Sequence, residues 1–193
     1  MENLIVEIEG SGRHIHLTDE AVDVLFGKGY KLKVRKELTL PGAFVCEEKL
    51  TLVGPRGEIK GVGILGPNRS ANQIELSFTD ARALGINPPV RNSGDTKGSA
   101  PITIVGPAGT LELSEGAIVA NRHIHMSDAT AEKYGFKDKD VVKVRCGKDR
   151  PIIMENVLIR LGSPLDSMHI DYDEQNAAGL FNVKPMLGEV IKD

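Results

Sequence analysis

Residues 11–35 read SGRHIHLTDEAVDVLFGKGYKLKVR, and residues 120–145 read ANRHIHMSDATAEKYGFKDKDVVKVR. The Arg-His-Ile-His cores of these two stretches lie 109 residues apart. In each copy, apolar alternation predicts a strand that carries the histidines, and an N-cap at Thr18 or Ser127 predicts that a short helix follows. A glycine-bearing turn and a strand ending in Lys-Val-Arg come next. The repeat indicates two halves with one common fold, produced by internal duplication.

A weaker match extends the repeat. The stretch ILGPNRSANQIELSFTDARALG from Ile64 aligns with RLGSPLDSMHIDYDEQNAAG from Arg160, at a spacing of 96 residues. This alignment sets the predicted strand at residues 73–75 beside residues 169–171, and a short helix follows each. Val/Ile-rich runs broken by Gly-Pro turns, such as ITIVGPAGTLEL, predict further strands of small barrels or curled sheets. We therefore expect a mainly β fold with short capping helices.

The best candidate for a linker is PPVRNSGDTKGS, which begins at Pro88. It is rich in turn-forming residues and poor in apolar ones, as linkers are. This predicts two domains, residues 1–90 and 91–193, between which individual strands can exchange.

The amino-acid composition argues against several classes of protein. The 193-residue chain has 24 basic and 27 acidic residues, and this balance gives no electrostatic reason to expect nucleic-acid binding. The two cysteines, Cys46 and Cys146, form no Cys-x-x-Cys pair, which argues against a disulfide framework and a cysteine zinc finger. We find neither an apolar run that could cross a bilayer nor a secretory signal. We therefore expect a cytoplasmic protein without a membrane partner.

The histidines are candidate metal ligands. Residues i and i+2 of a strand point to one face, so each His-x-His motif can hold a metal ion. Four of the five histidines form the two motifs, His14 with His16 and His123 with His125. The fifth, His169, lies on the strand aligned with that of Glu75, which makes these two residues further candidates. Six nitrogen and oxygen ligands suit two zinc ions with open positions, and open positions are typical of catalytic sites.

Three arginines lie close to these motifs in the sequence. Arg13 and Arg122 each precede a motif and alternate to the opposite face of its strand, where packing or ion pairing is at least as well supported as a functional role. Arg69 follows the turn residues Gly-Pro-Asn, just before the strand of Glu75. It could hold a phosphate or carboxylate bidentately, or it could be a solvated loop charge. The residues alone leave both interpretations of Arg69 open.

Taken together, the motifs resemble those of the PduL-type phosphate propanoyltransferases, a phosphotransacylase family associated with bacterial microcompartments and with propanediol, propionate or acetate metabolism. The resemblance covers essentially the whole chain, through RHIHLT, GPNR with the following IEL strand, NRHIHMS and MHIDYDEQNAAG. It implies two β-barrel domains capped by short helices, with a two-zinc site at their junction. It also implies that an acyl group, propanoyl or acetyl, is exchanged between coenzyme A and phosphate.

The motifs shared with the family imply which residues of this chain form the site. The resemblance implies one zinc held by His14, His16, Glu75 and His169, and a second held by His123 and His125. It makes Arg69 the catalytic arginine, and it assigns no coenzyme A-binding residue. The expected partners are acyl-CoA and phosphate, with assembly into a homo-oligomer left open. Encapsulated members are expected to carry an N-terminal extension, and because none precedes the first predicted strand, a free cytoplasmic enzyme is favoured over one in a microcompartment lumen.

Two other classes match part of the pattern. Cupins also use His-x-His followed by Glu, and residues 14–16 with Glu20 and Gly27 mimic the first cupin motif; such a dioxygenase or isomerase would bind one iron or manganese ion per chain. However, a helix cap at Thr18 takes Glu20 off the strand, and Glu132 comes too late in the second copy. The other alternative is a non-catalytic binding module in which zinc only joins the two halves.

Overall fold

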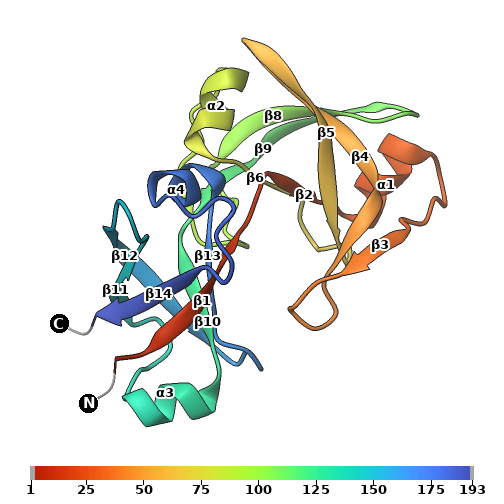
Figure 1. The fold of residues 1–193 in the computed structure, drawn as a ribbon. Coiled ribbons are helices and arrows are strands. Elements are labelled where there is room, and N and C mark those ends of the chain that lie inside the picture. The colour runs from red at the N-terminus through yellow and green to blue at the C-terminus, as the bar shows by residue number, and fades with distance from the viewer. Residues whose placement is uncertain (1–2, 192–193) are drawn as a thin grey trace. The chain divides into compact units, whose positions relative to one another are not determined.

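The computed structural model describes residues 3–191, a mainly β chain with four short helices in that range (Figure 1). The contacts divide the chain into two units. Unit 1 contains the residues up to Ser11 together with those from Asn121 onward, and unit 2 is Gly12–Ala120. Each unit has its own cluster of buried apolar side chains. None of the helices within residues 3–191 has the length and apolar character of a membrane span.

Unit 1 is a closed barrel of six strands in the order β1-β13-β10-β12-β11-β14. The strands are β1 (Ile5–Gly10), β10 (His123–Met126), β11 (Val141–Cys146), β12 (Ile152–Leu161), β13 (Ser167–Ile170) and β14 (Leu187–Ile191). Helices α3 (Asp128–Tyr134) and α4 (Tyr172–Ala177) follow β10 and β13. Val6, Ile8, Ile124 and Met168 are buried in the core, so the residues that alternate with them face away from it.

Unit 2 closes a second ring of six strands, in which β9, β6, β2, β5, β4 and β8 follow one another and β8 pairs back with β9. These strands are β2 (His14–His16), β4 (Phe44–Gly54), β5 (Gly57–Gly66), β6 (Gln73–Glu75), β8 (Ala100–Val105) and β9 (Thr110–Ala120). The short strands β3 (Val34–Glu37) and β7 (Val90–Arg91) pair with β4 and β9, and the helices are α1 (Asp19–Phe26) and α2 (Phe78–Leu84). The predicted fold class, two mainly β barrels with short helices, is confirmed.

The two barrels repeat one topology. β2 pairs parallel with β5 and antiparallel with β6, and β10 pairs in the same way with β12 and β13. This register sets His14 opposite Glu75. It sets His123 opposite His169. Glu75 and His169 are therefore equivalent residues and lie 94 positions apart, so the predicted spacing of 96 is wrong. A slip of two residues keeps every side chain on its face of the strand, so the choice of candidate ligands is unaffected.

The division of the chain differs from the predicted domains 1–90 and 91–193. β1 precedes the first His-x-His motif but pairs with β13 and β14 of unit 1. β9 precedes the second motif but pairs with β6 and β8 of unit 2. Each motif is therefore preceded by a strand of the other unit, which is the exchange that the sequence allowed. The segment from Pro88 belongs to unit 2, because β7 within it pairs with β9.

Helix starts follow the sequence signals. The Thr18 side chain accepts a hydrogen bond from the N–H of Ala21, and that of Ser127 accepts one from Thr130. Glu20 lies in α1, so it is not on the strand as a cupin motif would require.

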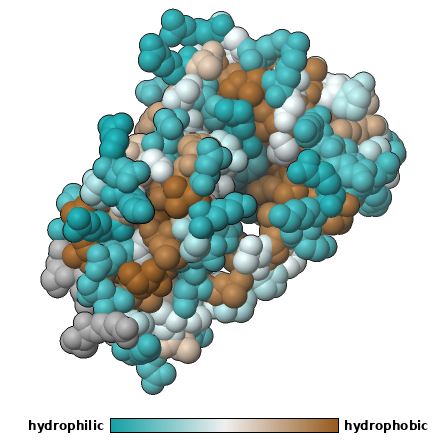
Figure 2. Space-filling model, viewed as in Figure 1, coloured by the Kyte–Doolittle hydropathy of each residue, from teal (hydrophilic) through white to brown (hydrophobic). Residues whose placement is uncertain are grey.

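On the face visible in Figure 2, hydrophilic residues cover much of the surface and apolar residues show in patches between them.

Candidate metal centres

The first candidate set, here called the carboxylate set, consists of His14, His16 and Glu75 in unit 2. β2 presents both histidines on one face, and the β2–β6 register brings Glu75 to the same place. One ligand atom of each side chain lies within 4.8 Å of the others. Nε2 of His14 is 3.5 Å from Oε2 of Glu75. The structure thus brings together three of the predicted ligands.

Backbone carbonyls fix the two imidazole rings of this set. Nδ1 of His14 lies 2.8 Å from the carbonyl oxygen of Gly12, and Nδ1 of His16 lies 3.1 Å from that of Leu65. A carbonyl accepts only from a protonated nitrogen, so in the neutral ring Nε2 keeps its lone pair. Nε2 is therefore the nitrogen that each of these histidines could offer to a metal ion.

Burial and neighbouring charges set the protonation of the carboxylate set. Burial lowers the pKa of His16 to about 3, and the charges of His14 and Arg69 act in the same direction. Burial also disfavours the charged form of His14, but the Glu75 carboxylate raises the pKa of His14 above its usual value. Burial alone would raise the pKa of Glu75, yet His14 and a hydrogen bond from Ser93 hold it well below its usual range. Glu75 is thus an ionised carboxylate, the form that binds metals.

Gln73 and Ser93 hold the Glu75 carboxylate, and neither was predicted from the sequence. Ser93 Oγ donates to Oε1 of Glu75 at 2.8 Å, and Nε2 of Gln73 donates to the same oxygen at 2.7 Å. Oε1 of Gln73 accepts from the N–H of Gly94, which ties the loop after β7 to the set. The signal for Gln73 was its place two residues before Glu75 on one strand face. Ser93 lies in the segment predicted to be a linker, and no periodic pattern there indicates that its partner is Glu75.

Arg69 lies beside the carboxylate set. Its backbone N–H donates to the carbonyl of Leu17 at 2.8 Å, and its Nη1 lies 3.5 Å from Ser93 Oγ. The residue is exposed, and its positive charge acts to lower the pKa of both His14 and His16. A guanidinium in this position attracts anions to the set.

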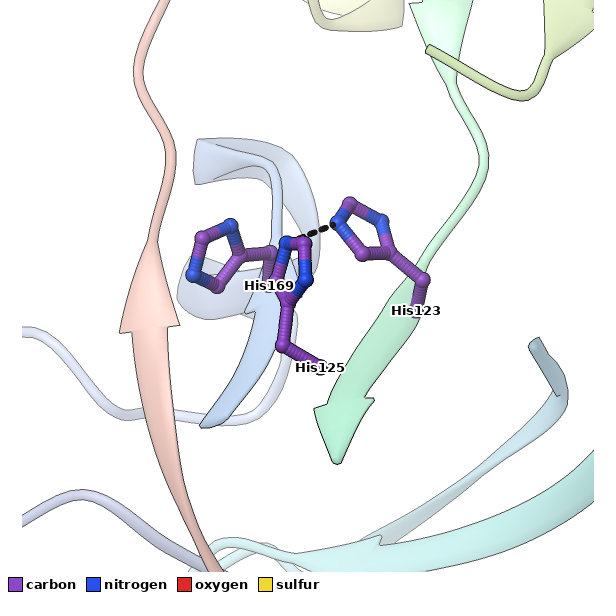
Figure 3. Close-up of side chains that lie close together, drawn as sticks. All are labelled: His123, His125 and His169. Carbon is purple, nitrogen blue, oxygen red and sulfur yellow. Dashed lines mark hydrogen bonds between the residues drawn. The ribbon is translucent and has the colours of Figure 1, made fainter. Parts of the chain in front are cut away.

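The second candidate set, the three-histidine set, consists of His123 and His125 on β10 and His169 on β13, all in unit 1 (Figure 3). Ligand atoms of the three rings lie within 4.8 Å of one another, and the Nε2 atoms of His123 and His125 are 3.2 Å apart. Nδ1 of His123 lies 3.0 Å from the carbonyl oxygen of Asn121, which matches His14 and Gly12 in unit 2. Burial lowers the pKa of His125 to about 4, with the charges of His169 and Arg160 acting in the same direction.

The grouping of His169 differs from the one implied by the family resemblance. That grouping placed His169 with His14, His16 and Glu75, whereas the structure places it with His123 and His125. The reason is the pairing of β13 with β10, which sets His169 directly opposite His123. The six predicted ligands are all brought into candidate sets, three in each unit.

Both sets have the donor chemistry of zinc sites. Zinc binds imidazole nitrogen and carboxylate oxygen tetrahedrally at about 2.0–2.2 Å, so two of its ligands lie about 3.3 Å apart. The separations of 3.2 Å in the three-histidine set and 3.5 Å in the carboxylate set agree with that spacing. Opposite His125, the buried hydroxyl of Ser167 has no hydrogen-bond partner among the described residues, as expected beside a site that receives a polar ligand. Three ligands per ion would leave a fourth position open.

Arg13 and Arg122 form ion pairs, which is one of the roles that their position on the strand left open. Arg13 contacts Asp80 at 2.7 Å, and Arg122 contacts Glu174 at 2.6 Å. Asp80 and Glu174 are the third residues of α2 and α4 and complete the capping boxes of those helices. Each pair joins a histidine strand to the helix that follows the third ligand of the same set.

Fold and sites together define the class: a duplicated β-barrel protein with one candidate metal set in each unit. Residues 7–181 match the family model described as phosphate propanoyltransferase. A phosphate propanoyltransferase of Listeria monocytogenes is 47% identical over 188 residues, which cover 97% of this chain and 87% of the relative. One of Thermotoga maritima is 49% identical over 172 residues, with coverage of 88% and 82%. The chain belongs to the phosphate propanoyltransferase family, as the motifs predicted, and is therefore a transferase.

Proposed function

We propose that this chain interconverts a short-chain acyl-CoA and phosphate with an acyl phosphate and coenzyme A, the acyl group being propanoyl or acetyl. Family membership supports a phosphotransacylase. The observation that carries the proposal is the exposed guanidinium of Arg69 beside a set of buried ligands, His14, His16 and Glu75. Such a pairing provides both a cation for phosphate and a place for a metal ion.

We assign one zinc ion to each set. In the carboxylate set the ligand atoms would be Nε2 of His14, Nε2 of His16 and a carboxylate oxygen of Glu75. In the three-histidine set they would be one nitrogen each of His123, His125 and His169. The chemistry that zinc supplies when bound is polarisation of a carbonyl oxygen and affinity for thiolate sulfur, and both suit a thioester substrate.

The role we assign to Arg69 is to hold and orient phosphate. Its planar guanidinium can bind two phosphate oxygens at once. In the transfer, a phosphate oxygen bonds to the acyl carbon while the carbon–sulfur bond breaks. The proton lost by the phosphate balances the one gained by the coenzyme A thiolate. Orienting the two anions for this step is a contribution that requires no covalent chemistry from Arg69.

We propose direct transfer, without an acyl-enzyme, because the cysteines are unsuited to be nucleophiles. Both thiols are buried. Burial raises the pKa of Cys46 to about 11, and it also raises the pKa of Cys146, so both remain protonated at neutral pH. Mixing stoichiometric protein with acyl-CoA in the absence of phosphate should release no burst of coenzyme A. A burst equal to the protein concentration would contradict direct transfer.

The test of the proposed function is thiol release from acetyl-CoA and propanoyl-CoA by zinc-replete protein, with and without phosphate. We expect release only when phosphate is present, and the ratio of the two rates identifies the preferred acyl group. Release without phosphate would indicate a hydrolase instead. Failure to release thiol from any short-chain acyl-CoA, combined with unfolding on chelation, would favour the non-catalytic zinc module. One iron or manganese ion per chain would favour a cupin-like enzyme.

A further inference from the structure

The two metal sets can be compared residue by residue, because the barrels repeat one topology. In unit 2, the strand register joins three residues in a row across β2, β6 and β9, namely His14, Glu75 and Ile118. The carboxylate of this row stands on the middle strand, and an apolar residue stands on the flanking strand.

The equivalent row in unit 1 crosses β10, β13 and β1 and joins His123, His169 and Glu9. Here the middle strand carries an imidazole, and the flanking strand carries a carboxylate where unit 2 has Ile118. Each row thus contains one carboxylate, shifted by one strand between the two units. This substitution pattern makes Glu9 a candidate member of the three-histidine set.

The geometry of β1 directs Glu9 toward His169. Val6 and Ile8 are each 1% exposed in the barrel core, so Glu7 and Glu9 alternate to the other face, which is the face of His169. Oε2 of Glu9 lies 3.7 Å from Nε2 of His169, close to the 3.5 Å between the His14 and Glu75 atoms. Figure 3 shows one nitrogen of the His169 ring directed toward β1.

We infer that Glu9 is a positioning residue of the three-histidine set, an inference that rests on the proposed zinc function. At 3.7 Å the Glu9 carboxylate lies within ion-pair distance of Nε2 of His169. A small rotation of either side chain would let the carboxylate accept a hydrogen bond from Nε2–H, and the ring would then present Nδ1 to the ion. A carboxylate behind a metal-bound histidine fixes the tautomer and orientation of the ring and makes it a better ligand. His14 and His123 have backbone carbonyls in that role, whereas His169 has a carboxylate.

Zinc affinity tests this inference. The three-histidine set is measured alone in a His16→Ala background, by competition with a chelator, for Glu9→Gln and Glu9→Ile. Loss of an outer partner lowers metal affinity about 10- to 100-fold, so both variants should bind zinc more weakly by such a factor, with Glu9→Ile the weaker. Glu7→Gln is the matched control, because Glu7 lies on the same strand and face but opposite Ser167, and it should leave the affinity unchanged.

A second measurement separates positioning from folding. Isoleucine favours strands more than glutamate does and is the residue that unit 2 uses, so Glu9→Ile should not lower the melting temperature of the zinc-free protein. The visible absorption of bound Co²⁺ should change in both Glu9 variants, because the ligand ring is no longer held.

The outcomes separate this inference from the proposed function. Zinc binding at both sets, with the affinity and Co²⁺ absorption of the Glu9 variants equal to those of the parent, would overturn the role of Glu9 alone. Absence of zinc binding at either set would overturn the zinc assignment itself. A loss of affinity in Glu9→Ile that is matched by unfolding, with Glu9→Gln unchanged, would also count against positioning.

Discussion

At the scale of single residues, the chemistry proposed for the carboxylate set depends on side chains that surround the ligands. Replacing Arg69 with Ala should lower turnover about 100-fold or more, the usual cost of removing a group that stabilises charge in the transition state. Zinc content should not change, because Arg69 is assigned to phosphate and not to the metal. Initial rates and elemental analysis of the same preparation test both statements.

Arg56→Ala is the control for this variant, because Arg56 is also an exposed arginine of unit 2, in the turn between β4 and β5. It should keep the parent rate. Full activity in Arg69→Ala would refute the assignment of Arg69, and loss of zinc would show that Arg69 supports the metal set instead.

Ser93 has a different kind of role, because its hydroxyl donates to a proposed ligand, Glu75. Ser93→Ala should weaken zinc binding at the carboxylate set about 10-fold, the lower end for an outer partner, since Gln73 still donates to the same carboxylate. Chelator competition in a His123→Ala background measures this set alone. Ser114→Ala, at an exposed position of β9, should have no effect; an equal loss in both variants would remove the case for Ser93.

At the scale of the elements, each histidine strand is joined to a helix by an ion pair. Asp80 is only 5% exposed, so Arg13→Ala would leave a buried carboxylate without its guanidinium. Because the Arg13 side chain is itself 42% exposed, we expect a loss of about 2 kcal/mol in the free energy of unfolding, below the range for fully buried pairs. Urea denaturation at neutral pH measures it.

The matched control is Arg91→Ala, since Arg91 and Asp95 form a pair in which both side chains are exposed. Such pairs contribute about 0–1 kcal/mol, so this variant should unfold close to the parent. Equal losses in the two variants would mean that the Arg13 pair adds nothing beyond a surface contact.

The helices and strands also show which features of the structure can be predicted from the sequence and which cannot. Thr18 and Ser127 identify helix starts because a cap is a local signal between residues three apart. The His-x-His motifs identify ligands because strand alternation is local too. The exchange of β1 and β9 could be allowed but not assigned, since strand partners distant in the chain are fixed by the packing of the whole barrel. Ser93 was missed for the same reason, because its partner Glu75 is distant in sequence and the loop has no periodicity.

At the scale of the whole molecule, the neutral histidines of both units make the metal-free protein sensitive to acid. His16 and His125 have folded-state pKa values of about 3 and about 4, well below the ordinary value of 6.5. Between pH 6.5 and 4.5 the unfolded chain therefore binds protons that the folded chain does not, and the free energy of unfolding should fall as the pH falls. His14, with a raised pKa, opposes this fall only near pH 6.5, and Glu75, with a lowered pKa, adds to it near pH 4.5, so these two residues do not reverse the sign.

Urea midpoints of chelator-treated protein between pH 6.5 and 4.5 measure this effect. The midpoint should drop steadily on acidification, and His16→Gln should flatten the profile because one of the two responsible groups is gone. A midpoint that stays constant or rises as the pH falls would show that these histidines are not held neutral.

We propose that each unit assembles its own zinc set, and the zinc content of purified protein measures this assembly. We predict two zinc ions per chain in the parent, one in His16→Ala, one in His123→Ala and none in the double variant. A parent with one zinc ion or none, or a single variant that keeps both ions, would contradict one zinc set per unit.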